Sequence, residues 1–295
     1  MHEQVTLHTA DGAILTVHLQ RPEREQGAAL ILLHGAASNH TRWWHFNRHS
    51  QLGQHHRLLC PDLRGHGDSI WRGPATLDHW CRDLAQLLDQ QKLQSAILIG
   101  HCLGANLAIH FAARFPERCA GLVLIEPMLR PALRGTLARL EHFAPLLSML
   151  VVLTRLVNRL GVYRRRLRRV DLKQLDRDWH TANQSSDVAN DMADRYGSPW
   201  HDLKAVPTGQ YLGNLLAVMQ SPPLARVRCP TLAILPTGRR MTDPERTREE
   251  LSRLNSLEIC ELDADHWIPT RQPDAMVACI DDWVAQLGTL TVNRR

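Results

Sequence analysis

Residues 100–104, with the sequence G-H-C-L-G, have residue types and spacing suited to nucleophilic chemistry. The stretch follows a short apolar run at 96–99 and precedes a segment with helical periodicity at 105–114, so we expect a buried strand, a turn and a helix. Glycines flank the turn because a side chain at either position would collide with neighbouring backbone. The pattern therefore predicts that the side chain of Cys102 is held on a tight corner.

A thiol at this position is suited to act as a nucleophile. The positive end of a helix dipole, helped by a cationic histidine, lowers a cysteine pKa from about 8.5 into the range of ~3.5–7.5. The thiolate is the species that attacks carbonyl carbon atoms. The alternative is that Cys102 is a small apolar residue buried at a turn, the usual environment of a free cysteine.

Three further stretches accompany this motif, and each follows or forms an apolar run typical of a buried strand. The sequence H-G-A-A-S stands at 34–38, D-L-R-G-H-G-D-S at 62–69, and a strand pattern at 121–125 leads into Glu126 and Pro127. With these motifs the chain resembles the α/β-hydrolase fold family, in particular its esterase, thioesterase and haloalkane-dehalogenase-like branches. The resemblance covers residues 1–127 and about 228–288.

The resemblance implies an α/β fold with a mostly parallel eight-stranded sheet flanked by helices. Residues 1–127 and 228–295 would form the core, and the helical pattern of 128–227 would be an inserted cap that covers the nucleophile. The alternation of strands and helices independently favours a parallel sheet with right-handed crossovers. A ligand site is then expected beyond the carboxyl ends of the strands.

The resemblance also implies catalytic partners for Cys102. His266, between the last strand pattern and the closing helix, would be the catalytic histidine, and the amides of Ala36 and Leu103 would form the oxyanion hole. The expected acid motif, G-x-x-D, is missing, because residues 238–241 read G-R-R-M. Asp243 and Glu126 are the candidate acids, and we rank Asp243 slightly ahead.

Three functions are compatible with these residues. The first is a cysteine-dependent hydrolase of an ester, thioester or lactone that works through an acyl-cysteine, on a small-molecule acyl substrate that could be carrier- or CoA-linked. The second is an acyltransferase or condensing enzyme on the same fold. The third is a non-catalytic binding protein, which the missing G-x-x-D motif favours.

The composition is that of an ordinary globular protein, with 44% hydrophobic and 22% charged residues. The net charge of +5 arises locally, so no nucleic-acid partner is expected. The seven cysteines are scattered without metal-ligand spacing, so we expect neither a disulfide framework nor a zinc site. We therefore expect the protein to be located in a reducing compartment, the cytoplasm. No secretory signal, metal motif or nucleotide or flavin motif is recognisable, so no cofactor is expected.

One segment of the expected cap combines an apolar stretch at 143–153 with a basic cluster at 163–169. This pairing predicts a surface that accepts acyl chains or contacts an anionic membrane. The alternative is an amphipathic cap helix with a solvated arginine face. The longest apolar run, 146–153, is too short to span a bilayer. The oligomeric state is not predicted.

Overall fold

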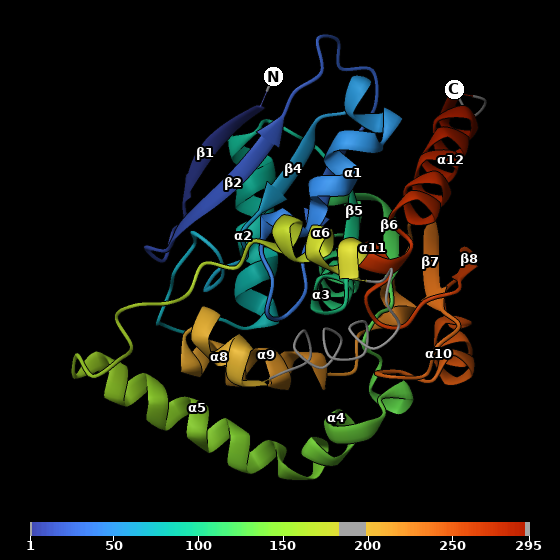
Figure 1. The fold of residues 1–295 in the computed structure, drawn as a ribbon. Coiled ribbons are helices and arrows are strands. Elements are labelled where there is room, and N and C mark those ends of the chain that lie inside the picture. The colour runs from blue at the N-terminus through green and yellow to red at the C-terminus, as the bar shows by residue number, and fades with distance from the viewer. Residues whose placement is uncertain (1, 183–198, 293–295) are drawn as a thin grey trace.

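The computed structural model describes residues 2–182 and 199–292, which are built around one eight-stranded sheet (Figure 1). The strand order is β1-β2-β4-β3-β5-β6-β7-β8, in which β2 runs antiparallel to β1 and β4 and the remaining pairs are parallel. The strands are β1 (His2–His8), β2 (Ile14–Gln20), β3 (Ala29–Leu33), β4 (Leu58–Pro61), β5 (Ala96–His101), β6 (Cys119–Ile125), β7 (Thr231–Pro236) and β8 (Leu257–Leu262). The predicted fold class is therefore confirmed.

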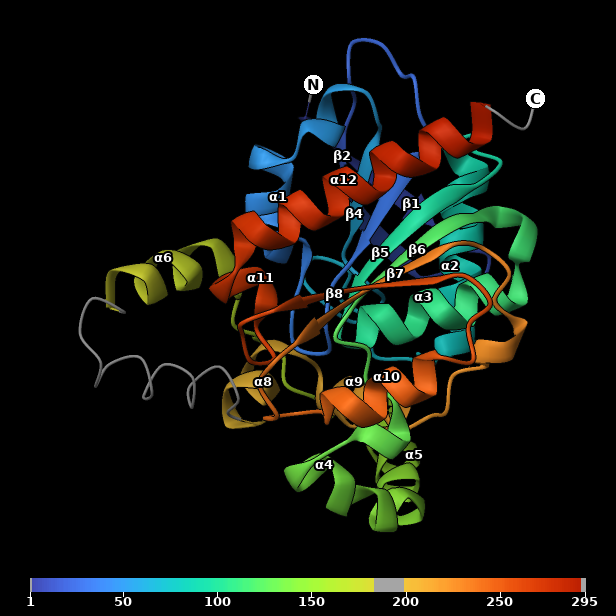
Figure 2. The same ribbon diagram turned by 90° about the vertical axis from the view of Figure 1, so that its right-hand side faces the viewer.

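The central strands are apolar at successive positions because both faces of the sheet are covered. In β3, Ile31 and Leu33 join one buried cluster, whereas Leu30 and Leu32 join the other. Helices α2 (Leu77–Gln90) and α3 (Leu103–Arg114) cover the first face, and α1 (Trp44–His49) and α12 (Pro273–Val292) cover the second, as Figure 2 shows. The alternation of burial thus fixes which face each side chain occupies.

The long connection between β6 and β7 is helical in its described part. Figure 1 shows α4, α5, α8 and α9 together below the sheet, whereas α6 runs beside α11. The bounds are α4 (Gly135–Leu140), α5 (Ala144–Arg159), α6 (Leu172–Ala182), α8 (Pro199–Ala205) and α9 (Thr208–Val218), and after β7 follow α10 (Pro244–Leu251) and α11 (Ile268–Arg271). Residues 183–198 of the expected cap lie outside the described residues, and the division into core and cap stays a prediction.

Several element bounds agree with expectation and one does not. The apolar stripe of Leu84, Leu87 and Leu88 predicts a helix over 77–90, which is observed with those bounds, and Thr76 caps it by accepting from the His79 amide. From the sequence we expect Gly288 to end the closing helix, but α12 continues to Val292. A glycine inside a helix costs only about 1 kcal/mol relative to alanine, so tertiary context overrides it.

The cysteines give a second correction. Cys260 in β8 and Cys279 in α12 are joined as a disulfide, with their Cα atoms 7.0 Å apart. The scattered spacing concealed this pair because packing of α12 beside β8 brings the two positions together. The remaining cysteines are free: Cys60, Cys81, Cys102, Cys119 and Cys229.

A third difference concerns the apolar stretch of the helical connection. The continuous helical run Gly135–Arg159 has 25 residues and is long and apolar enough, by length and composition, to cross a membrane. Only 11% of the 18-residue apolar stretch within this run is buried. The sequence prediction is too short because it considers only the apolar run at 146–153. In the structure, α4, a 3-10 turn at Glu141–Phe143 and α5 follow one another without a break.

Candidate functional site

Cys102 lies on a sharp corner between β5 and α3, with φ of 55° and ψ of −118°. A non-glycine residue at positive φ is strained, so the surrounding structure must hold it there. The flanking glycines permit the corner to form. A Cβ atom at Gly100 would lie 2.3 Å from the carbonyl oxygen of Gly104, and a Cβ at Gly104 would lie 2.2 Å from the carbonyl oxygen of Leu33.

The predicted histidine lies against this corner. His266 is 7% exposed, it lines the same cavity as Cys102, and its Nδ1 lies 2.7 Å from Oε2 of Glu126. Burial of the imidazole opposes its charged form, but the interactions with Glu126 first and with Cys102 second outweigh it and raise the pKa of His266 to about 10. The imidazole is thus held between a carboxylate and the sulfur.

Glu126 is fixed on both of its carboxylate oxygens. It follows β6 at φ 40°, is 1% exposed, and its Oε1 accepts a 2.7 Å hydrogen bond from the hydroxyl of Thr242. Its amide donates to the carbonyl of Ile234 in β7 at 3.0 Å. The carboxylate therefore has one orientation, with Oε2 aimed at His266.

The ranking of Asp243 ahead of Glu126 was wrong as far as contact with His266 is concerned. Asp243 is the N-cap of α10, accepting from the amides of Glu245 and Arg246, and it pairs with Arg134 at 2.7 Å. These contacts turn its carboxylate away from the histidine. The loop after β7 instead supplies Thr242, a residue that the sequence interpretation missed although it lies next to the suspected acid.

The two predicted oxyanion amides belong to the turn after β3 and to the first residue of α3. The carbonyl of Gly35, in the same peptide unit as the Ala36 amide, accepts from Nδ1 of His34 at 2.8 Å, while Nε2 of His34 accepts from the Leu63 amide at 3.0 Å. Burial chiefly lowers the pKa of His34 to about 3, which keeps this bridge neutral. Leu103 is the first residue of α3, where an amide has no acceptor within the helix.

Two more side chains support the site and were not predicted. Nε2 of His101 donates to the backbone carbonyl of His266 at 3.0 Å, which ties the histidine loop to the end of β5. Asn106 in α3 holds Met128 by two hydrogen bonds, accepting from its amide at 2.8 Å and donating to its carbonyl at 2.7 Å. The chain is therefore anchored two residues after Glu126. Only the proximity of these side chains in three dimensions reveals their roles.

A cavity of about 480 Å³ opens onto Cys102 and His266. Its polar residues include Arg42, Arg134 and Asp202, and burial raises the pKa of Asp202 to about 7. The rest of the lining is mainly apolar and comes largely from the helical connection. These apolar residues are Met128, Leu137, Leu140, Leu172, Leu215, Val218, Met241 and Trp267.

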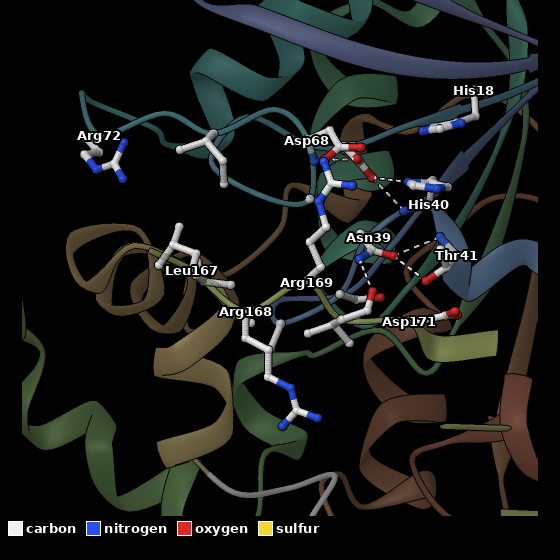
Figure 3. A pocket seen from close by; sticks show the side chains of 18 of the residues that line it. His18, Asn39, His40, Thr41, Asp68, Arg72, Leu167, Arg168, Arg169 and Asp171 are labelled. Carbon is white, nitrogen blue, oxygen red and sulfur yellow. Dashed lines mark hydrogen bonds and ion pairs between the residues drawn. The ribbon is translucent and has the colours of Figure 1, made fainter. Parts of the chain in front are cut away.

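A second cavity, of about 590 Å³, shares Ala37 and Ser38 with the first but does not contain Cys102 (Figure 3). It holds His18, His40 and Asp62, whose potential metal-ligand atoms lie within 4.8 Å of one another, the one such group among the described residues. Asp62, however, already accepts from the amide and ring of His40 and from the Asp68 amide. These hydrogen bonds tie the loop at 62–69 to His40, which is the structural role that the sequence predicts for Asp62.

Known proteins resemble this chain in both sequence and fold. Lipase LipV of Mycobacterium tuberculosis is 36% identical over 129 residues, which are 43% of this chain and 46% of that protein. A thermophilic esterase from Thermogutta terrifontis has a TM-score of 0.67 at 19% identity, with 97% of this chain and 99% of the esterase covered. The enol-lactonase of Burkholderia xenovorans also has a TM-score of 0.67, at 18% identity, with 95% and 100% covered.

The sequence match to the curated relative spans less than half of that protein, and the structural likenesses at this identity concern the fold alone. A family-wide comparison reaches further, since the sequence profile of the alpha/beta hydrolase fold matches residues 28–270. Together with the strand order and the corner at Cys102, this match shows that the chain belongs to the α/β-hydrolase fold family.

Proposed function

We propose that this protein is a cysteine-dependent hydrolase of carboxylic esters or thioesters that carry an apolar acyl group. One observation carries the proposal: His266, paired with Glu126, shares the wall of a mainly apolar cavity with Cys102. A nucleophile, a base and a residue that orients the base are the groups that acyl transfer requires. The relatives named lipase and esterase are consistent with this class of reaction.

In the first half-reaction the Cys102 thiolate attacks the acyl carbonyl carbon, and the carbonyl electron pair moves onto its oxygen. The amides of Ala36 and Leu103 donate to this oxyanion. The tetrahedral intermediate then collapses: the bond to the leaving oxygen or sulfur breaks, and the imidazolium of His266 gives that atom a proton. The products are the acyl-cysteine and the free alcohol or thiol.

In the second half-reaction His266, now neutral, takes a proton from a water molecule as that water attacks the acyl-cysteine. The sulfur leaves as thiolate, which restores the ion pair with the protonated imidazole and releases the carboxylic acid. Glu126 fixes the ring so that Nε2 faces the reaction and Nδ1–H faces its own carboxylate, and it stabilises the positive charge.

The shape of the cavity suggests the kind of acyl group. The apolar side chains of α4, α9 and the β6 exit offer burial worth about 0.8 kcal/mol for each methylene. Within its volume of about 480 Å³, we therefore expect kcat/KM to rise with acyl length until the chain fills the space.

The direct test is hydrolysis of 4-nitrophenyl esters of two to sixteen acyl carbons by the wild type, Cys102→Ala and Cys102→Ser. We expect Cys102→Ala to lose activity by at least a thousandfold, and an acyl adduct of the wild type on the peptide containing Cys102 in mass spectrometry after rapid acid quench. Equal rates for wild type and Cys102→Ala would refute the proposal. If activity depends on Cys102 but no acyl adduct can be trapped on it, the acyl-cysteine intermediate would be refuted.

Acyl transfer is the second candidate, because an acyl-cysteine can react with an acceptor other than water. Product analysis with added alcohols or thiols separates the two reactions. Hydrolysis predicts free acid at every acceptor concentration, whereas a transferase would form the new ester or thioester with little acid. A purely binding protein would bind the esters and release neither product.

A further inference from the structure

Helix α5 has two apolar faces, but only one of them is covered by protein. Leu147 and Val151 are buried on the side that packs against α9. On the same side Thr154 lies so close to Gly209 that a Cβ atom there would be 3.3 Å from its methyl group. A helix that is apolar on two faces requires a second environment for the other face.

The other face of α5 forms a continuous exposed stripe, which we call the α5 stripe. Its residues are spaced by three and four positions, so they line one side of the helix. Figures 1 and 2 show α5 at the outer edge of the molecule, away from the sheet. The exposed fractions are 48% for Leu146, 58% for Met149, 51% for Leu153, 54% for Leu156 and 76% for Leu160, and the neighbouring Phe143 and Val152 are 56% and 66% exposed.

The charged side chains of the segment that carries the α5 stripe have one sign, and Arg169 at its far end pairs with Asp68 at 3.0 Å. Residues 142–170 contain no aspartate or glutamate, and beyond the middle of the helix they include Arg159, three arginines at 164–166 and two at 168–169. All six of these arginines are exposed. Figure 1 shows that the segment holding the last five rises directly from the end of α5.

We infer that the α5 stripe docks on the surface of an anionic lipid membrane. Apolar side chains of this kind enter the boundary between headgroups and acyl chains, and the arginines attract the anionic headgroups. A second copy of this chain is a poorer occupant, because two identical faces would bring their arginines together. Contiguous exposed apolar surface of this extent marks an interaction site in proteins.

The geometry favours a helix that lies on the membrane rather than one that crosses it. The 16 residues of α5 span about 24 Å at 1.5 Å per residue, less than the ~30 Å hydrocarbon core of a bilayer. The run Gly135–Arg159 reaches the length of a span only by including α4, which lines the cavity beside Cys102. The face formed by Leu147 and Val151 is already committed to α9. Docking would therefore bury only the outer side of the helix.

Docking also bears on the source of the substrate, and this part of the inference rests on the proposed function. Helix α4, which leads into α5, lines the catalytic cavity with Thr136, Leu137 and Leu140. A membrane in contact with the α5 stripe would thus lie beside one wall of that cavity. The substrate class this arrangement fits is an acyl ester or thioester that resides in the lipid layer.

The test is sedimentation of the full chain with vesicles of phosphatidylcholine alone or of phosphatidylcholine and phosphatidylglycerol at 3:1. We expect the wild type to bind the anionic vesicles at least tenfold more tightly, and Met149→Asp/Leu153→Asp to lose at least tenfold of that binding. Ile14→Asp is the matched control, since Ile14 is 55% exposed on β2, and should bind like the wild type. Arg165→Glu/Arg166→Glu should reduce the preference for anionic vesicles by at least threefold.

Equal binding by Met149→Asp/Leu153→Asp and wild type, with unchanged circular dichroism and Tm, would overturn the inference. So would a wild-type dimer in analytical ultracentrifugation that this variant abolishes, with no vesicle binding by either protein. Cys102→Ala is expected to bind vesicles like the wild type. Vesicle binding without any hydrolysis would therefore leave the docking surface standing while the proposed function fell.

Discussion

Nδ1 of His266 lies 2.7 Å from Oε2 of Glu126, although 140 positions separate them in the chain. The contact follows from the sheet register. His101 pairs with Ile125 across β5 and β6, so Cys102 and Glu126 are the next residues of two neighbouring parallel strands. Glu126 and Cys102 thus leave the sheet side by side, and the loop after β8 brings the imidazole of His266 next to them.

Replacement of the two candidate acids should separate their roles. Glu126→Gln removes the negative charge that raises the pKa of His266 toward 10, so we expect kcat/KM for a short ester to fall by about a hundredfold or more. The pH at which the imidazolium is lost should also move down. Asp243→Asn keeps a good helix cap and should leave kcat/KM within about twofold. A large loss in Asp243→Asn with none in Glu126→Gln would contradict this assignment.

Cys102 should react faster at neutral pH than the buried free thiols Cys60 and Cys81. It lines the cavity beside His266, whereas burial raises the pKa of Cys60 and of Cys81 to about 12. Limiting iodoacetamide followed by peptide mapping should label Cys102 at least tenfold faster than either. His266→Asn should slow that labelling at pH 7 without accelerating it elsewhere. Preferential labelling of Cys60 in the wild type would count against the site.

The corner at Cys102 should not tolerate a methyl group on its helix side. Gly104→Ala would place a Cβ atom 2.2 Å from the Leu33 carbonyl oxygen, and backbone atoms on both sides cannot yield cheaply. We expect a loss of about 3 kcal/mol or more in the free energy of unfolding by urea. Gly288→Ala, with nothing within 4 Å of the added atom, is the control and should stabilise α12 by up to about 1 kcal/mol. Equal stability of the two variants would show that β3 and α3 lie farther apart than in the structure described above.

Acid should destabilise the fold through its buried neutral histidines. Burial first of all lowers the pKa of His34 from 6.5 to about 3, so the unfolded chain binds the additional proton between these values. The free energy of unfolding should therefore fall as the pH drops from about 6.5 toward 3, by about 1 kcal/mol per pH unit for this residue. Urea unfolding at pH 7.0 and 5.5 measures the loss. His34→Gln should have a shallower pH dependence, whereas the exposed His142→Gln should follow the wild type.

Much of the sheet was predictable because its residues carry local signals. Both faces of β3, β5 and β6 are covered, so their sequences are uninterrupted apolar runs, and the helix at 77–90 has a threonine cap and an apolar stripe. Cys102 and His266 were predictable from their positions after particular strands. The structure places both residues in the lining of one cavity, and their catalytic roles stay a prediction.

The acid could not be ranked from the sequence, because its identity depends on which loop packs against the imidazole. Asp243 stands close to the expected motif, yet Arg134 from the distant helical connection holds it. Thr242 and His101 act through contacts between segments far apart in the chain. The Cys260–Cys279 disulfide is likewise a product of packing between β8 and α12.

The Asn106 clamp on Met128 has a practical consequence for engineering. It fixes the backbone at the point where the chain leaves the sheet, while most of the apolar wall of the cavity is contributed further along. Segments from relatives could be transplanted after Leu129 without disturbing the strand ends that hold the sulfur, carboxylate and imidazole. Exchange of the segment after Leu129 should therefore change the acyl preference of the protein while the arrangement of the sulfur, carboxylate and imidazole is kept.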